Sequence, residues 1–217
     1  MHNKIFVKHK HYYILLLTAA IFTTSGYAQT AIKRKGTFPI KETFNRDDLP
    51  ANDYLQAQLK PIRSNFKRIN TIKHWTTIKE QNIETGEGLS VTFYYLDKQL
   101  EKIVTRQYGE TFQQLNEYYL YKGQLSFVLE RSYSYNRPIY YDSTVMKEQA
   151  DTVAFDFNKS EIEEARNYFE NDKLIHQLSN QDCGAPFATD YLLEEQKRIK
   201  ANFDSLTKLE AGRHRNK

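Results

Sequence analysis

The chain has 217 residues and a formal net charge of +4, from 31 Lys and Arg residues against 27 Asp and Glu residues. Lys4, Lys8 and Lys10 lie in an N-terminal segment without acidic residues, so the rest is almost neutral and nucleic acid is not an expected partner. A single cysteine excludes an intramolecular disulfide framework and a cysteine-rich zinc site. The uninterrupted apolar run is N-terminal, so no integral membrane span is expected once that segment is removed.

Residues 1–28 have the order of a secretory signal peptide. A basic segment precedes an apolar core from Tyr13 to Phe22, and small residues follow at Gly26 and Ala28, where a signal peptidase needs them. No cysteine follows the core, so a lipid anchor is not expected. An uncleaved anchor helix is the alternative, but the apolar run is short for one. We therefore predict cleavage after Ala28 and export to the periplasm or the extracellular space.

The remaining chain is expected to form one domain. The hydrophobic period is helical over 49–72, changes to two over 71–178 and is helical again near 190–208, a pattern typical of an α+β domain. The predicted division is a signal peptide over 1–28, a loose polar arm over 29–48, a single α+β domain over 49–212 and a basic tail over 213–217.

The first helical segment contains a proline. Its apolar stripe is Leu55, Leu59, Ile62, Phe66 and Ile69. Proline costs about 3 kcal/mol in a helix interior, so Pro61 predicts a helix that ends near Lys60, then a kink or a second short helix. A strand could begin at Ile69.

The last helical segment has both a start and a stop signal. Asp190 is the expected N-cap, and Gly212 is expected to end the helix. Its apolar residues form one stripe, which predicts packing on a sheet: Leu192, Ile199, Phe203 and Leu206.

Between the helices, alternating apolar and polar residues predict one antiparallel meander of about six to eight strands, with the N-terminal and the C-terminal helix packed on it. The strand signals lie at 75–78, 89–95, 100–108, 115–121, 125–133, 153–157, 162–169 and 174–178. Tight turns are expected at 97–99, 109–110 and 122–123.

Three of these hairpins share one pattern, an aromatic and an apolar residue, a polar turn and then a leucine: Tyr95–Leu100, Tyr119–Leu125 and Tyr168–Leu174. They resemble the tyrosine-rich hairpins of MORN-type and antitoxin-like meander proteins, although Gly123 is the one turn glycine in place. The run over 109–142 resembles a group of uncharacterised exported bacterial proteins, over most of 60–210. That resemblance implies export and a β-meander, and implies no activity.

The sequence contains no Gly-rich phosphate loop, His-Glu-x-x-His or Gly-x-Ser-x-Gly motif. His74 and His176 are expected to be polar strand residues, because a metal site would need both to converge with a carboxylate such as Glu80 or Asp156. We therefore predict no catalytic residue, no metal and no cofactor, and lean against an enzyme.

Two further features have a structural and a functional interpretation. Glu161, Glu163 and Glu164 form a carboxylate cluster, in which Glu161 and Glu163 are expected to share one face of a strand and point toward solvent. Cys183 lies in a polar turn without a nearby basic residue, so a buried small residue is expected, and a reactive thiol or an intermolecular disulfide is the alternative.

Tyrosine is the residue type that stands out. Ten of the thirteen tyrosines after residue 28 lie between Tyr94 and Tyr141. Tyrosine suits half-buried strands, and it also forms surfaces that bind a protein, peptide or glycan. Beside the loop around Pro138 lie the candidate ligand-binding residues: Tyr133, Tyr135, Tyr140 and Tyr141.

Two function classes follow. The first is an exported, non-catalytic binding or protein-interaction module that uses an aromatic sheet face. The alternative is a small envelope hydrolase acting through carboxylates or His176. The sequence does not indicate an oligomeric state.

The signal peptide can be tested directly. N-terminal sequencing of the protein from its native host should begin near Gln29, because Gly26 and Ala28 fit the cleavage pockets. A cytosolic product that still begins with Met1 would contradict this prediction.

Overall fold

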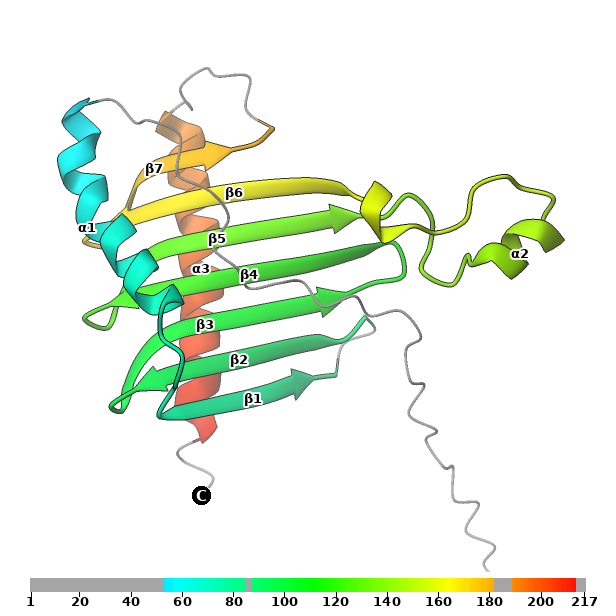
Figure 1. Ribbon diagram of the computed structural model, residues 1–217. Helices are drawn as coiled ribbons and strands as arrows, with labels where there is room; N and C mark the ends of the chain where they lie inside the picture. Colours follow the sequence, from blue (N-terminus) through cyan, green and yellow to red (C-terminus); the bar gives the residue numbers. More distant parts are fainter. Residues whose placement is uncertain (1–52, 85–86, 182–188, 214–217) are drawn as a thin grey trace, which may run out of the picture. The chain divides into compact units, whose positions relative to one another are not determined.

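The computed structural model describes residues 53–84, 87–181 and 189–213. The expected signal peptide, the N-terminal arm and Cys183 lie outside these residues. Within them, a seven-stranded antiparallel sheet has its strands in chain order, and one long helix packs on each face (Figure 1). This confirms the predicted α+β meander with an N-terminal and a C-terminal helix.

The elements follow the predicted order with two differences: the short helix α2 is added, and a 3-10 turn replaces the strand predicted over 153–157. They are α1 (Asp53–Asn70), β1 (Thr77–Ile83), β2 (Leu89–Leu96), β3 (Gln99–Tyr108), β4 (Phe112–Tyr121), β5 (Gln124–Ser134), α2 (Ser143–Glu148), a 3-10 turn (Phe157–Lys159), β6 (Glu161–Glu170), β7 (Lys173–Ser179) and α3 (Thr189–Arg213).

The hairpins β2–β3, β4–β5 and β6–β7 are copies of one structure. Each turns through two residues with positive φ, which is the type I′ turn that matches the twist of antiparallel strands: Asp97–Lys98, Lys122–Gly123 and Asn171–Asp172. Each also has a register shift next to its turn, at Tyr94/Tyr95, Tyr119/Leu120 and Tyr168/Phe169. The predicted hairpins are confirmed, with Tyr94 rather than Tyr95 equivalent to Tyr119 and Tyr168.

An insertion makes the spacing of these hairpins uneven. Tyr94 and Tyr119 are 25 residues apart, whereas Tyr119 and Tyr168 are 49 apart. Residues 109–111 join β3 to β4, but residues 135–160 join β5 to β6. We call the latter segment the β5–β6 excursion; Figure 1 shows it extending beyond the ends of the strands together with α2. The repeat is regular apart from this segment.

Helix α1 covers one face at the turn end of the hairpins. Leu59, Ile62 and Ile69 of α1 are buried against a row of aromatic and apolar strand residues, Tyr119, Phe127, Leu129 and Tyr168. The Phe66 ring lies 4.7 Å from the rings of Tyr119 and Phe127. Two of the regularly placed hairpin tyrosines, Tyr119 and Tyr168, therefore supply part of the surface on which α1 packs.

Helix α3 crosses the opposite face from β7 to β1 (Figure 1). At its beginning, the Gln196 side chain accepts a hydrogen bond from the Leu174 backbone of β7 at 2.9 Å. Near its end, Glu210 accepts a 2.5 Å hydrogen bond from Tyr95 of β2 and pairs with Lys79 of β1. The predicted apolar stripe is confirmed in the core of this face: Leu192, Ile199, Phe203 and Leu206.

The predicted end of α1 near Lys60 is wrong, because the helix continues through Pro61 to Asn70. The buried stripe continues past the proline with Ile62 and Ile69. Burial of an apolar side chain stabilises by about 1.5–3 kcal/mol, so these contacts together outweigh the roughly 3 kcal/mol that a proline costs. Ile69 is accordingly helical and does not begin a strand.

The predicted boundaries of α3 are also wrong. The helix already includes Thr189, so Asp190 lies in the first turn, and it runs through Gly212 to Arg213. Gly212 costs a helix only about 1 kcal/mol, and the contacts of Leu209 and Glu210 with the sheet hold the preceding turn.

Three smaller predictions need correction. A strand was predicted to begin at Trp75, but β1 begins at Thr77. Trp75 precedes the strand and packs against Tyr94, with ring centroids 5.3 Å apart. His74 lies in the same connection and not in a strand. Residues 153–157 form no strand, because Asp156 caps a 3-10 turn there by accepting a hydrogen bond from the Asn158 backbone at 3.0 Å.

Because α3 packs on the sheet through one side, substitutions on its buried side should destabilise the protein much more than substitutions on its exposed side. Phe203 lies over Tyr118, with ring centroids 6.2 Å apart. A fully buried phenylalanine loses about 3–5 kcal/mol on truncation, so the partly buried Phe203 should lose about 2–3 kcal/mol as Phe203→Ala. Thermal unfolding should show a melting temperature lower by roughly 5–10 °C.

The exposed Lys197 on the same helix provides the control. Lys197→Ala should leave the melting temperature nearly unchanged. Equal, small effects for both variants would mean that α3 does not dock through this stripe.

Candidate functional site

Three of the four predicted tyrosines pack within the molecule. Tyr133, near the end of β5, stacks on Phe157 with ring centroids 5.6 Å apart. Tyr135 meets Phe155 edge-on at 5.2 Å. Burial raises the pKa of Tyr135 to about 12. These rings join the excursion to the end of the sheet.

Tyr141 belongs to a polar cluster inside the excursion. Its hydroxyl donates a 3.1 Å hydrogen bond to Asp151, and Arg137 forms a 2.8 Å ion pair with the same carboxylate oxygen. The Arg137 guanidinium also lies over the Tyr141 ring, 5.6 Å from its centroid. A hydrogen bond from the Thr152 backbone has the largest effect on the pKa of Asp151 and lowers it. The hydrogen bond from Tyr141 and the positive charge of Arg137 lower this pKa further, so it lies below its usual range. Asp151 thus joins two distant parts of the excursion.

Tyr140 differs from these three residues. Its side chain is 58% exposed, and Val153 elsewhere in the excursion is 37% exposed. The structure therefore brings Tyr133, Tyr135 and Tyr141 into packing roles, and leaves Tyr140 as the predicted site residue that is available on the surface.

Residues that the sequence analysis did not identify hold the excursion in shape. The Asn136 amide donates to the Ala154 carbonyl at 3.0 Å and accepts from the Asp156 backbone at 2.9 Å. Asp142 caps α2 by accepting from the backbone of Thr144 at 2.8 Å. The signal for the cap was the Asp-Ser-Thr run, whereas the long-range bonds of Asn136 have no local signal.

The α1 face contains charged side chains that are almost fully buried. Lys102 and Glu117 form a 2.5 Å ion pair in which the side chains are 5% and 2% exposed. The Tyr119 hydroxyl donates to the same carboxylate at 2.6 Å. Burial of the Tyr119 hydroxyl is the main cause that holds its pKa well above the usual value, and the negative charge of Glu117 raises this pKa further. Desolvation offsets much of the attraction within such a buried pair, whereas removal of either partner would leave a buried charge without its counter-charge.

The predicted carboxylate cluster is divided between the two faces of β6. Glu161 and Glu163 are exposed, whereas Glu164 accepts hydrogen bonds from Arg131 at 2.7 Å and Arg166 at 2.8 Å. Burial acts to raise the pKa of Glu164, but the two guanidinium groups outweigh it, so the pKa lies below its usual range. An ionised carboxylate between two arginines is poorly suited to general acid catalysis.

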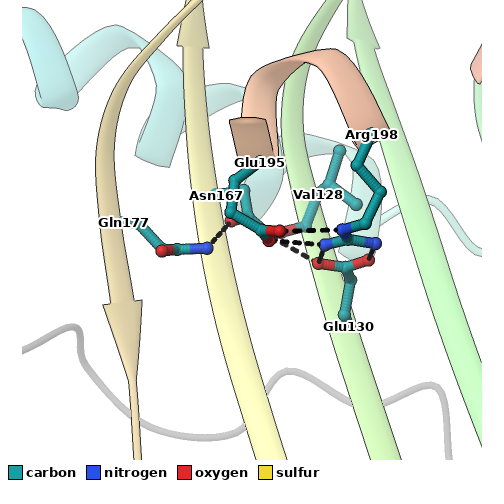
Figure 2. A network of polar contacts seen from close by, with 6 residues as sticks. All are labelled: Val128, Glu130, Asn167, Gln177, Glu195 and Arg198. Atoms are coloured by element: carbon teal, nitrogen blue, oxygen red, sulfur yellow. Dashed lines mark hydrogen bonds and ion pairs between the residues drawn. The ribbon is translucent and has the colours of Figure 1, made fainter. Parts of the chain in front are cut away.

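A second polar network fastens α3 to the sheet (Figure 2). Arg198 of α3 binds Glu130 of β5 through two hydrogen bonds of 2.8 Å and also binds Glu195 at 2.7 and 3.0 Å. Asn167 donates to Glu130 at 3.0 Å and accepts from Gln177 at 2.7 Å. The network connects β5, β6, β7 and α3, so it fixes where the helix lies on the sheet.

His176 lies in β7 against Tyr168, with ring centroids 5.6 Å apart. Within residues 53–84, 87–181 and 189–213, no three His, Cys, Asp or Glu side chains gather in a way that could hold a metal ion. Across those same ranges, no helix combines the length and apolar character needed to cross a membrane.

Comparison of the chain with family models, with curated proteins and with solved structures found no match. The resemblance to tyrosine-rich meander proteins stays a sequence-based prediction.

The Arg198 network predicts a pH-dependent stability effect. Arg198→Met leaves the Glu130 and Glu195 carboxylates, whose side chains are 15% and 18% exposed, without their shared counter-charge. Urea unfolding at pH 7 should show a loss of roughly 1–3 kcal/mol, limited by the partial exposure of Arg198.

The loss should shrink in acid. The hydrogen bond from Arg198 lowers the pKa of Glu195, so this carboxylate contributes stability above its usual pKa of 4.5, and that contribution disappears as the pH falls through the folded pKa. Lys200→Met is the control, because its 3.4 Å pair with Asp172, 60% exposed, should contribute at most about 0.5 kcal/mol. Equal losses for both variants, or a pH-independent loss for Arg198→Met, would contradict this account.

Proposed function

We propose that this protein is an exported, non-catalytic interaction module and that the β5–β6 excursion is its contact element for a protein partner. The observation that supports the proposal is an ordered insertion in an otherwise regular hairpin repeat. Residues 109–111 are sufficient to join β3 to β4, so the connection between β5 and β6 is much longer than joining two neighbouring strands of this sheet requires.

The defined conformation of the excursion is the second observation that supports the proposed function. Connections with more than about 12–15 residues outside secondary structure are usually either functional or disordered, and α2 and the 3-10 turn account for only 6 and 3 residues of the excursion. Holding a residue in one backbone conformation costs about 1–2 kcal/mol in entropy, and the Arg137–Asp151 pair and the Asn136 bonds offset part of this cost along the excursion. A segment that is ordered by dedicated contacts and lies outside the core is suited to presenting a surface.

Tyr140 is the residue best placed to anchor a partner. Tyrosine is among the residues that dominate binding energy at protein interfaces, because the ring is large and the hydroxyl can form a hydrogen bond. In this proposal Tyr133, Tyr135 and Tyr141 hold the excursion in place, and Tyr140 makes the contact. The predicted aromatic surface then lies at the end of the sheet instead of across its face, where α1 and α3 pack.

The hydrolase alternative has weaker support. Glu161 and Glu163 are exposed, and Glu164 is held between two arginines. His176 lies beside the Tyr168 ring.

Site-specific photo-crosslinking in the native host tests the proposal. A photoreactive phenylalanine at position 140 should produce a discrete adduct of higher mass with one protein. The same residue at Tyr191, which is 43% exposed on α3, is the matched control and should produce none.

A competition experiment tests whether the Tyr140 ring itself makes the contact with the partner. Excess wild-type protein should suppress the adduct from position 140, whereas excess Tyr140→Ala protein with an unchanged melting temperature should suppress it at least tenfold less effectively. The same adducts from positions 140 and 191, or none from position 140, would contradict the proposal.

A further inference from the structure

The hairpins β4–β5 and β6–β7 separate at their turn ends. Pairing between β5 and β6 begins at Phe127 and Tyr168. Each hairpin nevertheless continues beyond that point, to Tyr121–Gln124 in one and to Glu170–Lys173 in the other. Strand residues on both sides of the gap therefore have backbone groups that the β5–β6 ladder does not use.

A cavity of about 290 Å³ occupies this gap. We call it the hairpin cleft, and its lining comes from both hairpins and from α1: Pro61, Ile62, Tyr121, Lys122, Gln124, Leu125, Ser126, Phe169, Glu170 and Asn171. A hydrogen bond of 3.3 Å from Gln58 of α1 to the Glu170 carboxylate connects the helix to the cleft.

The cleft combines one accessible aromatic ring with polar groups of both kinds. Tyr121 is 47% exposed, and the Lys122 ammonium lies 5.3 Å from its ring centroid. Leu125 and Phe169, which are 3% and 2% exposed, belong to the core, so the apolar part of the lining is firmly held. Amide, hydroxyl, ammonium and carboxylate groups provide hydrogen-bond donors and acceptors.

The volume of the hairpin cleft and the charges of its lining residues limit the kinds of ligand that can bind there. Binding pockets for drug-sized molecules usually have about 300–1,000 Å³, so this cavity suits a single small ring. Lys122 and Glu170 contribute opposite charges to the lining, which favours a neutral ligand. A pyranose fits both limits, because its C–H face can lie on an aromatic ring while each hydroxyl group both donates and accepts hydrogen bonds.

We propose that the hairpin cleft binds one neutral pyranose ring, either a free sugar or the terminal unit of a glycan. The cleft lies at the end of β5 opposite the excursion, and the 11 residues of β5 place the two sites roughly 30 Å apart. The proposal is therefore independent of the protein contact assigned to the excursion.

Saturation-transfer NMR with the full mature protein tests the proposal, using D-glucose, D-galactose and N-acetyl-D-glucosamine as probes and glycine as a small zwitterion that carries both charges and has no ring. At least one pyranose should receive saturation from the protein, and glycine should not. Tyr121→Ala should weaken the affinity for that sugar at least tenfold, whereas Tyr191→Ala, the matched exposed tyrosine, should leave it unchanged.

Glu170→Gln provides a second variant, because it keeps the size of the side chain while removing its charge and part of its hydrogen bonding. It should weaken sugar binding several-fold without lowering the melting temperature. No binding of any pyranose, preferential binding of glycine, or sugar binding that neither Tyr121→Ala nor Glu170→Gln alters would overturn the proposal. Because Tyr140→Ala should not affect sugar binding, failure of either proposal leaves the other testable.

Discussion

The geometry of the hairpin ends determines the architecture of this protein. In each of three hairpins, a type I′ turn and the adjacent register shift direct a tyrosine to the α1 face and two apolar residues to the α3 face. The tyrosines are Tyr94, Tyr119 and Tyr168, and the apolar pairs are Tyr95–Leu100, Leu120–Leu125 and Phe169–Leu174. Since both faces are apolar near the turns, the sheet requires a helix on each, and the polar networks around Glu117 and Arg198 then set where strands and helix lie.

Local patterns predicted most of this fold. The period of two located six of the seven strands closely, and the Lys122–Gly123 turn and the stripe through Phe203 were correct. The errors arose where distant contacts decide the outcome. Pro61 and Gly212 are unfavourable in any isolated helix, yet both are helical here because the residues around them pack on the sheet. The uneven hairpin spacing has its physical cause in the excursion, which is inserted between two hairpins that otherwise follow each other directly.

The candidate site was harder to predict for the same reason. The sequence identified the tyrosines around Pro138, but it could not distinguish Tyr140, which is exposed, from Tyr141, which is held by Asp151. That distinction depends on Arg137 and Asp151, which are 14 residues apart. The hairpin cleft was not predicted, because it arises where the pairing of β5 with β6 ends, and no residue pattern within either strand indicates that point.

We infer that folding does not need the excursion, which leaves this segment available for binding. This inference is tested most directly by amide hydrogen exchange on a chain in which residues 135–160 are replaced by Gly-Glu-Thr, the residues that join β3 to β4. Our account predicts that the strand amides keep their protection and that the chain unfolds cooperatively, with a loss of no more than about 2 kcal/mol from the contacts of Tyr133 with Phe157. Loss of protection throughout β5 and β6 would show that the excursion is part of the folding core, and would contradict the account.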